Sequence, residues 1–387
     1  MDESMGRRHV IMRWRTKQHI GLMWWLGLSL TTGACLAVAA GTALVQQRET
    51  SPPMRLVPVF QEAEVKPVEP RRVLQHDGEY FILDYKASRI LVYDRAMKFE
   101  RSIGSVGAGP SEFFHPDDFV IRNGLIYVYD EGNHRIQVLD LGGKFINQFR
   151  LPYTRGLAVN SKGEILVGQP EEGRLVSAYS KDGKLLRSFG ELKSFSGVYG
   201  EQHKDKDTKY QTAINRVALT VDSQDFVYVT FVVAPIIQKY TPEGELVFET
   251  RLRGPSVDLL THYVVTEAMA KKIVVQFMGT DMANLTAWES SIDPRNGNIF
   301  ALLPDNALYV MNGEGEQVAI FTPRPVEKAR GYVYVRRANY SNAMMDRIYR
   351  GRALMFGRIT ILSDGTTFMV ALFPPYGIYR MELPEQV

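Results

Sequence analysis

A repeated module of glycine turns and short apolar strands constrains the fold of this 387-residue chain more than any other feature. Its clearest copy spans residues 104–149, where runs rich in Ile, Val and Tyr alternate with glycine-containing turns. β-Branched and aromatic residues favour strands, and Gly132 with Asn133 tolerates the positive φ angles that a tight reversal needs. Such a small sheet is apolar on both faces and needs neighbouring copies to cover them. The module therefore predicts a repeat architecture.

Six turns at equivalent places mark the copies along the chain. We place them near Gly78, Gly124, Gly163, Asp225, Gly297 and Gly365. A four-stranded propeller blade needs about 40–45 residues. The later turns are farther apart, so the later copies carry insertions, which we place at 191–213, 255–283 and 323–356. The sequence predicts an all-β fold over residues 71–387, a six-bladed β-propeller of four-stranded antiparallel blades.

The end of the chain predicts how the ring closes. The last copy supplies strands near 358–362, 367–372 and 377–383 and then stops one strand short. Residues 54–60, within a proline-containing linker over 46–70, have the composition of the missing outer strand. Pro58 is compatible with that place, because an outer strand has a free edge. We therefore expect the start of the linked domain to pair with its end.

The turn of the clearest copy carries a recognisable motif. A glycine, an asparagine and a histidine lie between Asp130 and Arg135, and the first copy keeps the same five-residue spacing with Asp84 and Arg89. The module resembles an NHL repeat, and the region from about residue 70 to 387 resembles the bacterial six-bladed β-propeller family. That resemblance implies the fold. It leaves function open, because similar propellers include lactonases, amidating lyases and sugar-acid hydrolases that hold Ca²⁺ or Zn²⁺ in the channel.

The N-terminal region predicts a membrane segment. Residues 20–45 contain no charged residue, and a helix of that length covers about 39 Å, enough for a hydrocarbon core of ~30 Å. Five basic residues precede it, so residues 1–19 are expected in the cytoplasm and the propeller outside it. We expect a single-pass protein of the cytoplasmic (inner) membrane, with an N-terminal transmembrane helix or signal anchor. The alternative is a signal peptide cleaved after the small residues Ala37 and Ala39.

Charge and cysteine content narrow the choice of partners. Residues 1–50 hold six Lys/Arg and three Asp/Glu, which accounts for the whole net charge of +3. The rest of the chain is neutral, so we expect no nucleic-acid partner, since such partners require a basic surface. Cys35 is the only cysteine and lies in the apolar segment. This excludes disulfides, thiolate zinc sites and cysteine nucleophiles from the propeller.

Charged residues gather where the innermost strands are expected to begin, beside the channel. The candidate ligand-binding residues are Arg72, Arg155, Arg216, Arg358, Asp118 and Trp288. Guanidinium groups bind carboxylates and phosphates bidentately, so a ring of them would take an anionic ligand. The alternative is a salt-linked rim, in which the arginines pair with the aspartates of the second copy.

The three insertions each join an outer strand to the next inner strand, and such connections emerge on one face of a propeller. We expect a protein or small-molecule ligand to bind there, because loops on a rigid scaffold often carry function. The alternative is that they only cap the ring. Ser256 is a candidate cap for a helix over 257–277, and Ser341 for a helix over 342–356. Their apolar stripes favour packing on the domain, or else contact with a partner or the membrane.

No catalytic signature is present. The sequence lacks HExxH, GxSxG and a glycine-rich phosphate loop. His115 and His134 belong to turns and are interpreted as structural. We therefore assign no catalytic residue, metal or cofactor, and expect a non-catalytic binding module for a protein or small ligand. The alternatives are a metal-dependent hydrolase or lyase with its site in the central channel, and a purely structural spacer.

Overall fold

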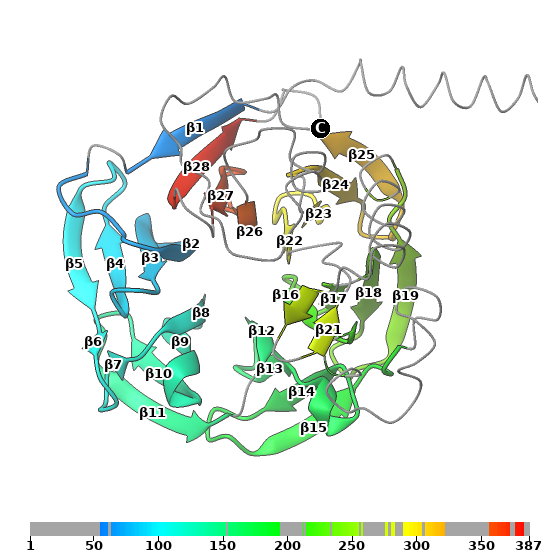
Figure 1. Ribbon diagram of the computed structural model, residues 1–387, viewed down its shortest axis with the longest axis horizontal. Helices are drawn as coiled ribbons and strands as arrows, with labels where there is room; N and C mark the ends of the chain where they lie inside the picture. The colour runs from blue at the N-terminus through cyan, green and yellow to red at the C-terminus, as the bar shows by residue number, and fades with distance from the viewer. Residues whose placement is uncertain are drawn as a thin grey trace, which may run out of the picture. The chain divides into compact units, whose positions relative to one another are not determined.

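The computed structural model divides into two units, Met1–Ser51 and Pro52–Val387, and describes parts of the second unit (Figure 1). The residues described are 55–60, 63–151, 154–193, 212, 214–232, 234–254, 257, 275–277, 280–282, 289–303, 306–321, 356–371 and 376–382. Every structural statement below concerns these residues.

Six four-stranded antiparallel sheets form the blades, which confirms the expected all-β six-bladed architecture. Blade one contains β2 (Pro70–His76), β3 (Glu79–Asp84), β4 (Arg89–Tyr93) and β5 (Phe99–Ile103). Blade two contains β8 (Pro116–Arg122), β9 (Leu125–Asp130), β10 (Arg135–Asp140) and β11 (Phe145–Arg150). Blade three contains β12 (Arg155–Val159), β13 (Ile165–Gly168), β14 (Val176–Tyr179) and β15 (Leu185–Phe189).

Blades four to six complete the ring in Figure 1. Blade four contains β16 (Val217–Val221), β17 (Val227–Phe231), β18 (Ile236–Tyr240) and β19 (Leu246–Arg251). Blade five contains β22 (Glu289–Ile292), β23 (Ile299–Leu302), β24 (Leu308–Met311) and β25 (Gln317–Phe321). Blade six contains β26 (Phe356–Ile361), β27 (Thr367–Ala371), β28 (Gly377–Glu382) and β1 (Arg55–Val59). Two short strands, β6 (Ser105–Val106) and β7 (Glu112–Phe113), pair in parallel between blades one and two.

The turns that end the inner strands adopt the conformation that the sequence predicts. All six marker residues have positive φ, between 67° and 87°. Asp225 is the one member that is not glycine, and its carboxylate accepts a hydrogen bond of 2.8 Å from the backbone N–H of Ser161 in blade three. The aspartate therefore tolerates the left-handed turn and also links two neighbouring blades.

The hydrophobic core lies between the blades. The buried apolar residues fall into six clusters, and each cluster joins two neighbouring blades around the ring. Strand β9 shows the reason, because alternate side chains of a strand point to opposite faces. Ile126 and Val128 pack toward blade one, whereas Tyr127 and Tyr129 pack toward blade three. A blade alone would leave both of these faces in water.

The ring closes through β1, which coincides with the expected strand over 54–60. It pairs antiparallel with β28, and Val57 lies opposite Arg380. Phe60, at the end of β1, reaches the core between blades six and one, where its ring lies 4.7 Å from that of Tyr93. The outer strand of the last blade therefore comes from the beginning of the domain.

Of the helices expected in two insertions, the first is helical at Val257 but wrong at its far end, and the second is wrong at its last residue. Within or beside the expected helix over 257–277, β20 (Val275–Phe277) and β21 (Thr280–Met282) pair as an antiparallel hairpin. A run of β-branched residues followed by Gly279 favours this hairpin over a helix. Phe356 begins β26 instead of ending a helix, so the third insertion ends at residue 355. The remaining residues of both predicted helices lie outside the described ranges.

In the part of the chain that the structure describes, no helix is both long enough and apolar enough to cross a membrane. The expected membrane segment, residues 20–45, lies outside that part.

Candidate functional site

The inner strands bring their first residues to one face of the ring, where the outer-to-inner connections also begin and end. We call this the insertion face. Four inner strands contain a bulge at the same place, where the register shifts between Pro70 and Arg72, Pro116 and Asp118, Arg155 and Leu157, and Phe356 and Arg358. Bulges redirect side chains. Here Arg72, Asp118 and Arg358 follow a bulge directly and meet at the channel.

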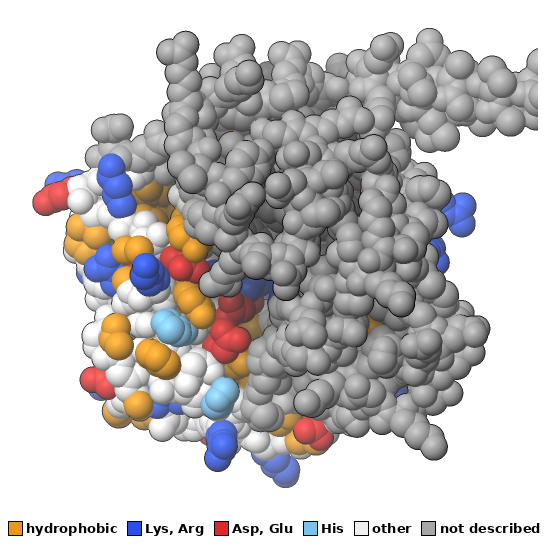
Figure 2. Space-filling view, in the orientation of Figure 1, with side chains coloured by type: hydrophobic (Ala, Val, Ile, Leu, Met, Phe, Trp, Pro, Cys, Tyr) orange, Lys and Arg blue, Asp and Glu red, His pale blue; other side chains and the backbone are white. Residues whose placement is uncertain are grey.

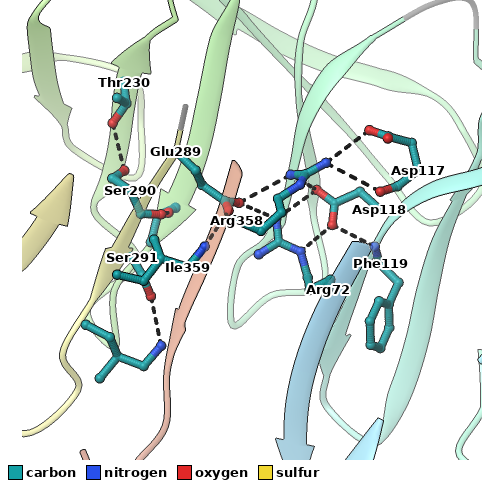
Figure 3. Close-up of polar contacts among 12 residues, drawn as sticks. Arg72, Asp117, Asp118, Phe119, Thr230, Glu289, Ser290, Ser291, Arg358 and Ile359 are labelled. Atoms are coloured by element: carbon teal, nitrogen blue, oxygen red, sulfur yellow. Dashed lines mark hydrogen bonds and ion pairs between the residues drawn. The ribbon is translucent and has the colours of Figure 1, made fainter. Parts of the chain in front are cut away.

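Two arginines and two carboxylates form a buried network at the channel (Figure 3). The Nε of Arg72 donates to Asp118 Oδ1 over 2.5 Å, and its Nη2 pairs with Glu289. The Nη1 of Arg358 lies 3.3 Å from Asp118 Oδ2 and 3.3 Å from Glu289 Oε1. The four residues come from blades one, two, five and six, so the network joins blades that are distant in sequence.

Backbone groups orient both carboxylates. Asp118 accepts a bond of 2.8 Å from the N–H of Phe119, and Glu289 accepts one of 3.1 Å from the N–H of Ile359. Each of these acidic residues is 2% exposed. The oxygens of both carboxylates are already bonded to guanidinium and amide groups. This half of the channel therefore links the blades structurally. It matches the alternative in which channel arginines pair with aspartates of the second copy.

The electrostatics of the network favour its charged forms. Burial by itself lowers the pKa of Arg72 and of Arg358, but the nearby carboxylates outweigh burial and raise both pKa values. Asp117, the bulged residue of β8, lies 3.0 Å from Nη2 of Arg358. Burial would raise the pKa of Asp117, but Arg358 and the other channel arginines hold it below its ordinary value.

Arg155 and Arg216 lie on the opposite side of the channel. Among the described residues, the Arg155 side chain makes no hydrogen bond and no ion pair. Lost hydration lowers the pKa of Arg155 even though Asp117 opposes that effect. Arg216, only 3% exposed, precedes β16, and burial lowers its pKa to about 10. The Arg155 guanidinium therefore carries a desolvation cost that an added anion would offset.

Glu131 lies at the same mouth, in the 3₁₀ helix η1 (Glu131–Asn133) that follows β9. Gly132 ties η1 to the segment before β8 by donating its N–H to the Phe114 carbonyl over 2.8 Å. Within the described part of the chain, the Glu131 carboxylate has no hydrogen bond or ion pair. Burial raises its pKa, and the charge of Asp117 raises it further. The mouth therefore contains an acid and a base that do not pair with each other.

A ladder of stacked side chains, which we call the aromatic ladder, borders this mouth. The guanidinium of Arg71 lies 4.2 Å from the Tyr85 ring centroid, Tyr85 stacks on His115 at 4.9 Å, and His115 stacks on Phe114 at 4.4 Å. Phe114 is 43% exposed. Figure 2 shows acidic side chains toward the middle of one face, with hydrophobic and histidine side chains over the blades beside them. His115 thus joins an exposed surface as well as a turn.

The NHL-like motif is structural. Asp130 is fully buried; its carboxylate accepts bonds of 2.8 Å from Arg135 Nε and 2.7 Å from the N–H of Phe114. Arg135 in turn donates to the carbonyls of Ala108 and Gly109 over 2.7 and 3.0 Å. The motif thus fastens the segment that leads into β8. It positions the channel strand without contacting the channel.

The structure places five of the six predicted site residues, in two groups. Arg72, Asp118 and Arg358 meet in the buried network, whereas Arg155 and Arg216 lie on the other side of the channel near Asp117 and Glu131. Trp288 lies outside the described residues.

Sequence reasoning missed Glu289 and Glu131. Glu289 follows Trp288 at the start of the fifth inner strand, and Glu131 directly follows the motif aspartate. Their positions in the repeat, at the start of an inner strand and directly after the motif aspartate, were the sequence signals that could have identified them.

Comparisons with known proteins agree with this fold. The sequence model of the DUF5128 family, described as a 6-bladed beta-propeller, matches residues 61–179. Protein brain tumor of Drosophila melanogaster is 27% identical over 119 residues, which cover 29% of this chain and 11% of that protein. The chain therefore spans about a tenth of the length of this curated relative.

One solved structure shows the same architecture at low identity. A protein of Bacteroides fragilis superposes with a TM-score of 0.51 at 10% identity, covering 86% of this chain and 95% of that one. A streptogramin B lyase gives a TM-score of 0.48 at 14% identity, covering 86% and 97%. The likeness to the Bacteroides fragilis protein concerns the fold alone. The six four-stranded sheets make the chain a six-bladed β-propeller, and its residues 61–179 are similar to the 6-bladed beta-propeller family DUF5128.

Proposed function

We propose that this protein is a non-catalytic binding module that takes an anionic group, a carboxylate or a phosphate, at the channel mouth on its insertion face. The observation that carries the proposal is the contrast between the arginines. Arg72 and Arg358 each pair with buried carboxylates, whereas Arg155 has no partner among the described residues. A planar guanidinium in a partly desolvated site is suited to bidentate anion recognition.

The same contacts count against a metal-dependent hydrolase or lyase at the buried network. A calcium site needs several oxygen ligands that converge on the ion. The oxygens of Asp118 and Glu289 are instead engaged by Arg72 and Arg358. Within the described ranges, no group of three or more His, Cys, Asp or Glu side chains is placed to hold a metal. A binding role therefore fits the described geometry better.

The proposal includes the setting of the module. Residues 20–45 anchor the chain in the cytoplasmic membrane, and the propeller lies on the extracytoplasmic side. The proposed ligand, either a protein or a small molecule, approaches the face where the insertions start and end. The apolar length of 20–45 and the basic residues before it support this arrangement.

Calorimetric titration of the propeller with phosphate and with citrate tests the binding role. We expect binding to the wild type, and a loss of at least tenfold in Arg155→Ala, because a hydrogen bond to a charged group contributes about 1.5–3 kcal/mol. Arg155→Lys should recover only part of the affinity. Arg150→Ala, at an exposed position on β11, is the matched control and should bind as the wild type does. Equal affinity in Arg155→Ala would contradict the proposal.

Protease treatment of spheroplasts tests the location. We expect the propeller to be digested in intact spheroplasts and to remain in the membrane fraction before digestion. A protected propeller would refute the extracytoplasmic placement, and a propeller released in soluble form would refute the anchor.

A further inference from the structure

The channel mouth holds two opposite charges, Arg155 and Glu131, which both feel the charge of Asp117 and form no ion pair with each other. Arg155 opens β12, and Glu131 lies in η1, which packs beside the start of β8. Neither side chain has a hydrogen bond or an ion pair among the described residues. Unpaired charges in a partly desolvated site are costly, so each favours a ligand group of opposite sign.

The backbone that carries Glu131 is held firmly. Asn133 donates its amide N–H groups to the Gly107 carbonyl over 2.9 Å and to Asp130 over 2.8 Å, and the Gly132 N–H bonds to the Phe114 carbonyl. On the other side, the N–H of Thr154, next to Arg155, donates to the Tyr129 hydroxyl over 3.2 Å. Both charges therefore lie on segments fixed by blade two, which is the rigid support that a binding site needs.

An apolar surface adjoins the acidic side of the mouth. Phe114, whose carbonyl anchors η1, is the exposed end of the aromatic ladder. Its ring is available to a side chain of a ligand whose charged groups lie at the mouth. Anion-binding, cation-binding and apolar groups thus meet at one place on the insertion face.

We propose that the channel mouth binds an amino-acid zwitterion, either free or as a short unblocked peptide, with its carboxylate on Arg155 and its ammonium on Glu131. This inference rests on the proposed function and names its ligand class. The ligand's side chain lies toward Phe114. A ligand with only one of the two charges leaves either Arg155 or Glu131 without a counter-charge. The site should therefore prefer zwitterions over ligands with a single charge.

The test is calorimetric titration of the complete propeller with three forms of each probe. The probes are the free L-amino acids and glycyl dipeptides, their N-acetyl forms, which keep only the anion, and their amide forms, which keep only the cation. For at least one amino acid we expect the free form to bind at least tenfold more tightly than either blocked form. Glu131→Gln should remove this preference for the free form, because a bond to a charged group contributes about 1.5–3 kcal/mol.

The control variant is Glu172→Gln, at the end of the 3₁₀ helix η2 (Pro170–Glu172), which holds the equivalent place in blade three. It should leave every affinity unchanged. If the N-acetyl forms bind as tightly as the free forms and Glu131→Gln changes nothing, the zwitterion inference is wrong and the anion-binding function stands. If no form binds, the inference is wrong, and failure of phosphate and citrate as well would overturn the proposed function.

Discussion

At the scale of single residues, the same motif pair is built differently in two blades. Asp130 is fully buried against Arg135, whose side chain is 10% exposed. Asp84 in blade one accepts the N–H groups of Val68 and Glu69 over 3.0 and 2.9 Å, and its partner Arg89 is 30% exposed at 3.5 Å. A buried charge that loses its partner costs more than an exposed one.

We therefore expect Asp130→Asn to lower the free energy of unfolding by about 3 kcal/mol, because it leaves a buried guanidinium without its counter-charge. Asp84→Asn keeps one of the two oxygens that accept backbone N–H groups, and its arginine partner is partly exposed, so it should cost less, about 1–2 kcal/mol. Urea titration of both variants measures the difference. If both variants lost the same free energy of unfolding, burial of the arginine would not determine how much the aspartate–arginine pair contributes to stability.

The buried channel network makes a similar prediction. Glu289→Gln removes one of the two carboxylates that serve both Arg72 and Arg358, and should lower the free energy of unfolding by about 3 kcal/mol. Glu243→Gln, in an exposed turn, is the matched control and should change stability by less than about 0.5 kcal/mol. A Glu289 variant as stable as its control would mean that the network does not hold the blades together.

The raised pKa of Glu131 gives the proposed ligand binding a pH dependence. Burial and Asp117 place this pKa above the ordinary glutamate value of 4.5. As the pH falls through the raised pKa, the carboxylate takes up a proton and loses its attraction for an ammonium group. Affinity for the free amino acid should therefore begin to fall at a pH above 4.5, and Glu131→Gln should lack this step. A wild-type affinity that is flat down to pH 4 would exclude the Glu131 contact.

At the scale of elements, β1 is the strand that makes a closed ring out of a linear repeat. Val57 lies opposite Arg380, so Val57→Cys with Arg380→Cys, in a Cys35→Ser background, should form a disulfide under mild oxidation. Non-reducing electrophoresis detects the bond, and the oxidised chain should gain about 2–4 kcal/mol of stability. The mismatched pair Val57→Cys with Val318→Cys, which joins blades six and five, should stay reduced. Efficient bonding of that pair would contradict the observed register.

At the scale of the whole molecule, ion pairs near the channel link the blades, so the stability of the ring depends on pH. The pKa of Asp117 lies below the ordinary aspartate value of 3.8, so its ion pair adds stability above that pH. This contribution, on the order of 1 kcal/mol for a residue that is partly exposed, is lost as the pH falls through the lowered pKa. The melting temperature of Asp117→Asn should therefore depend less on pH between about 4 and 2 than that of the wild type. Glu314→Gln, in an exposed hairpin, should retain the full slope.

Most of the architecture could be predicted from the sequence because its causes are local. Period-two alternation identifies strands such as β9, and glycine turns such as that at Gly124 fix the ends of the inner strands. The prediction of a helix over 257–277 is wrong at β20. A short apolar run there is compatible with the apolar face of a helix and with a strand, so the sequence pattern does not distinguish them.

The sequence by itself determined the number of blades, their strands and turns, and the strand that closes the ring, since each depends on neighbouring residues and on counting. Only the tertiary structure decided which charges meet at the channel. Arg72 contacts Glu289 across 217 positions of sequence, while Arg155 is left without such a partner among the described residues. Ring closure and the bulges of the inner strands set those pairings, and no local pattern encodes the distance between residues that are brought together only when the blades pack.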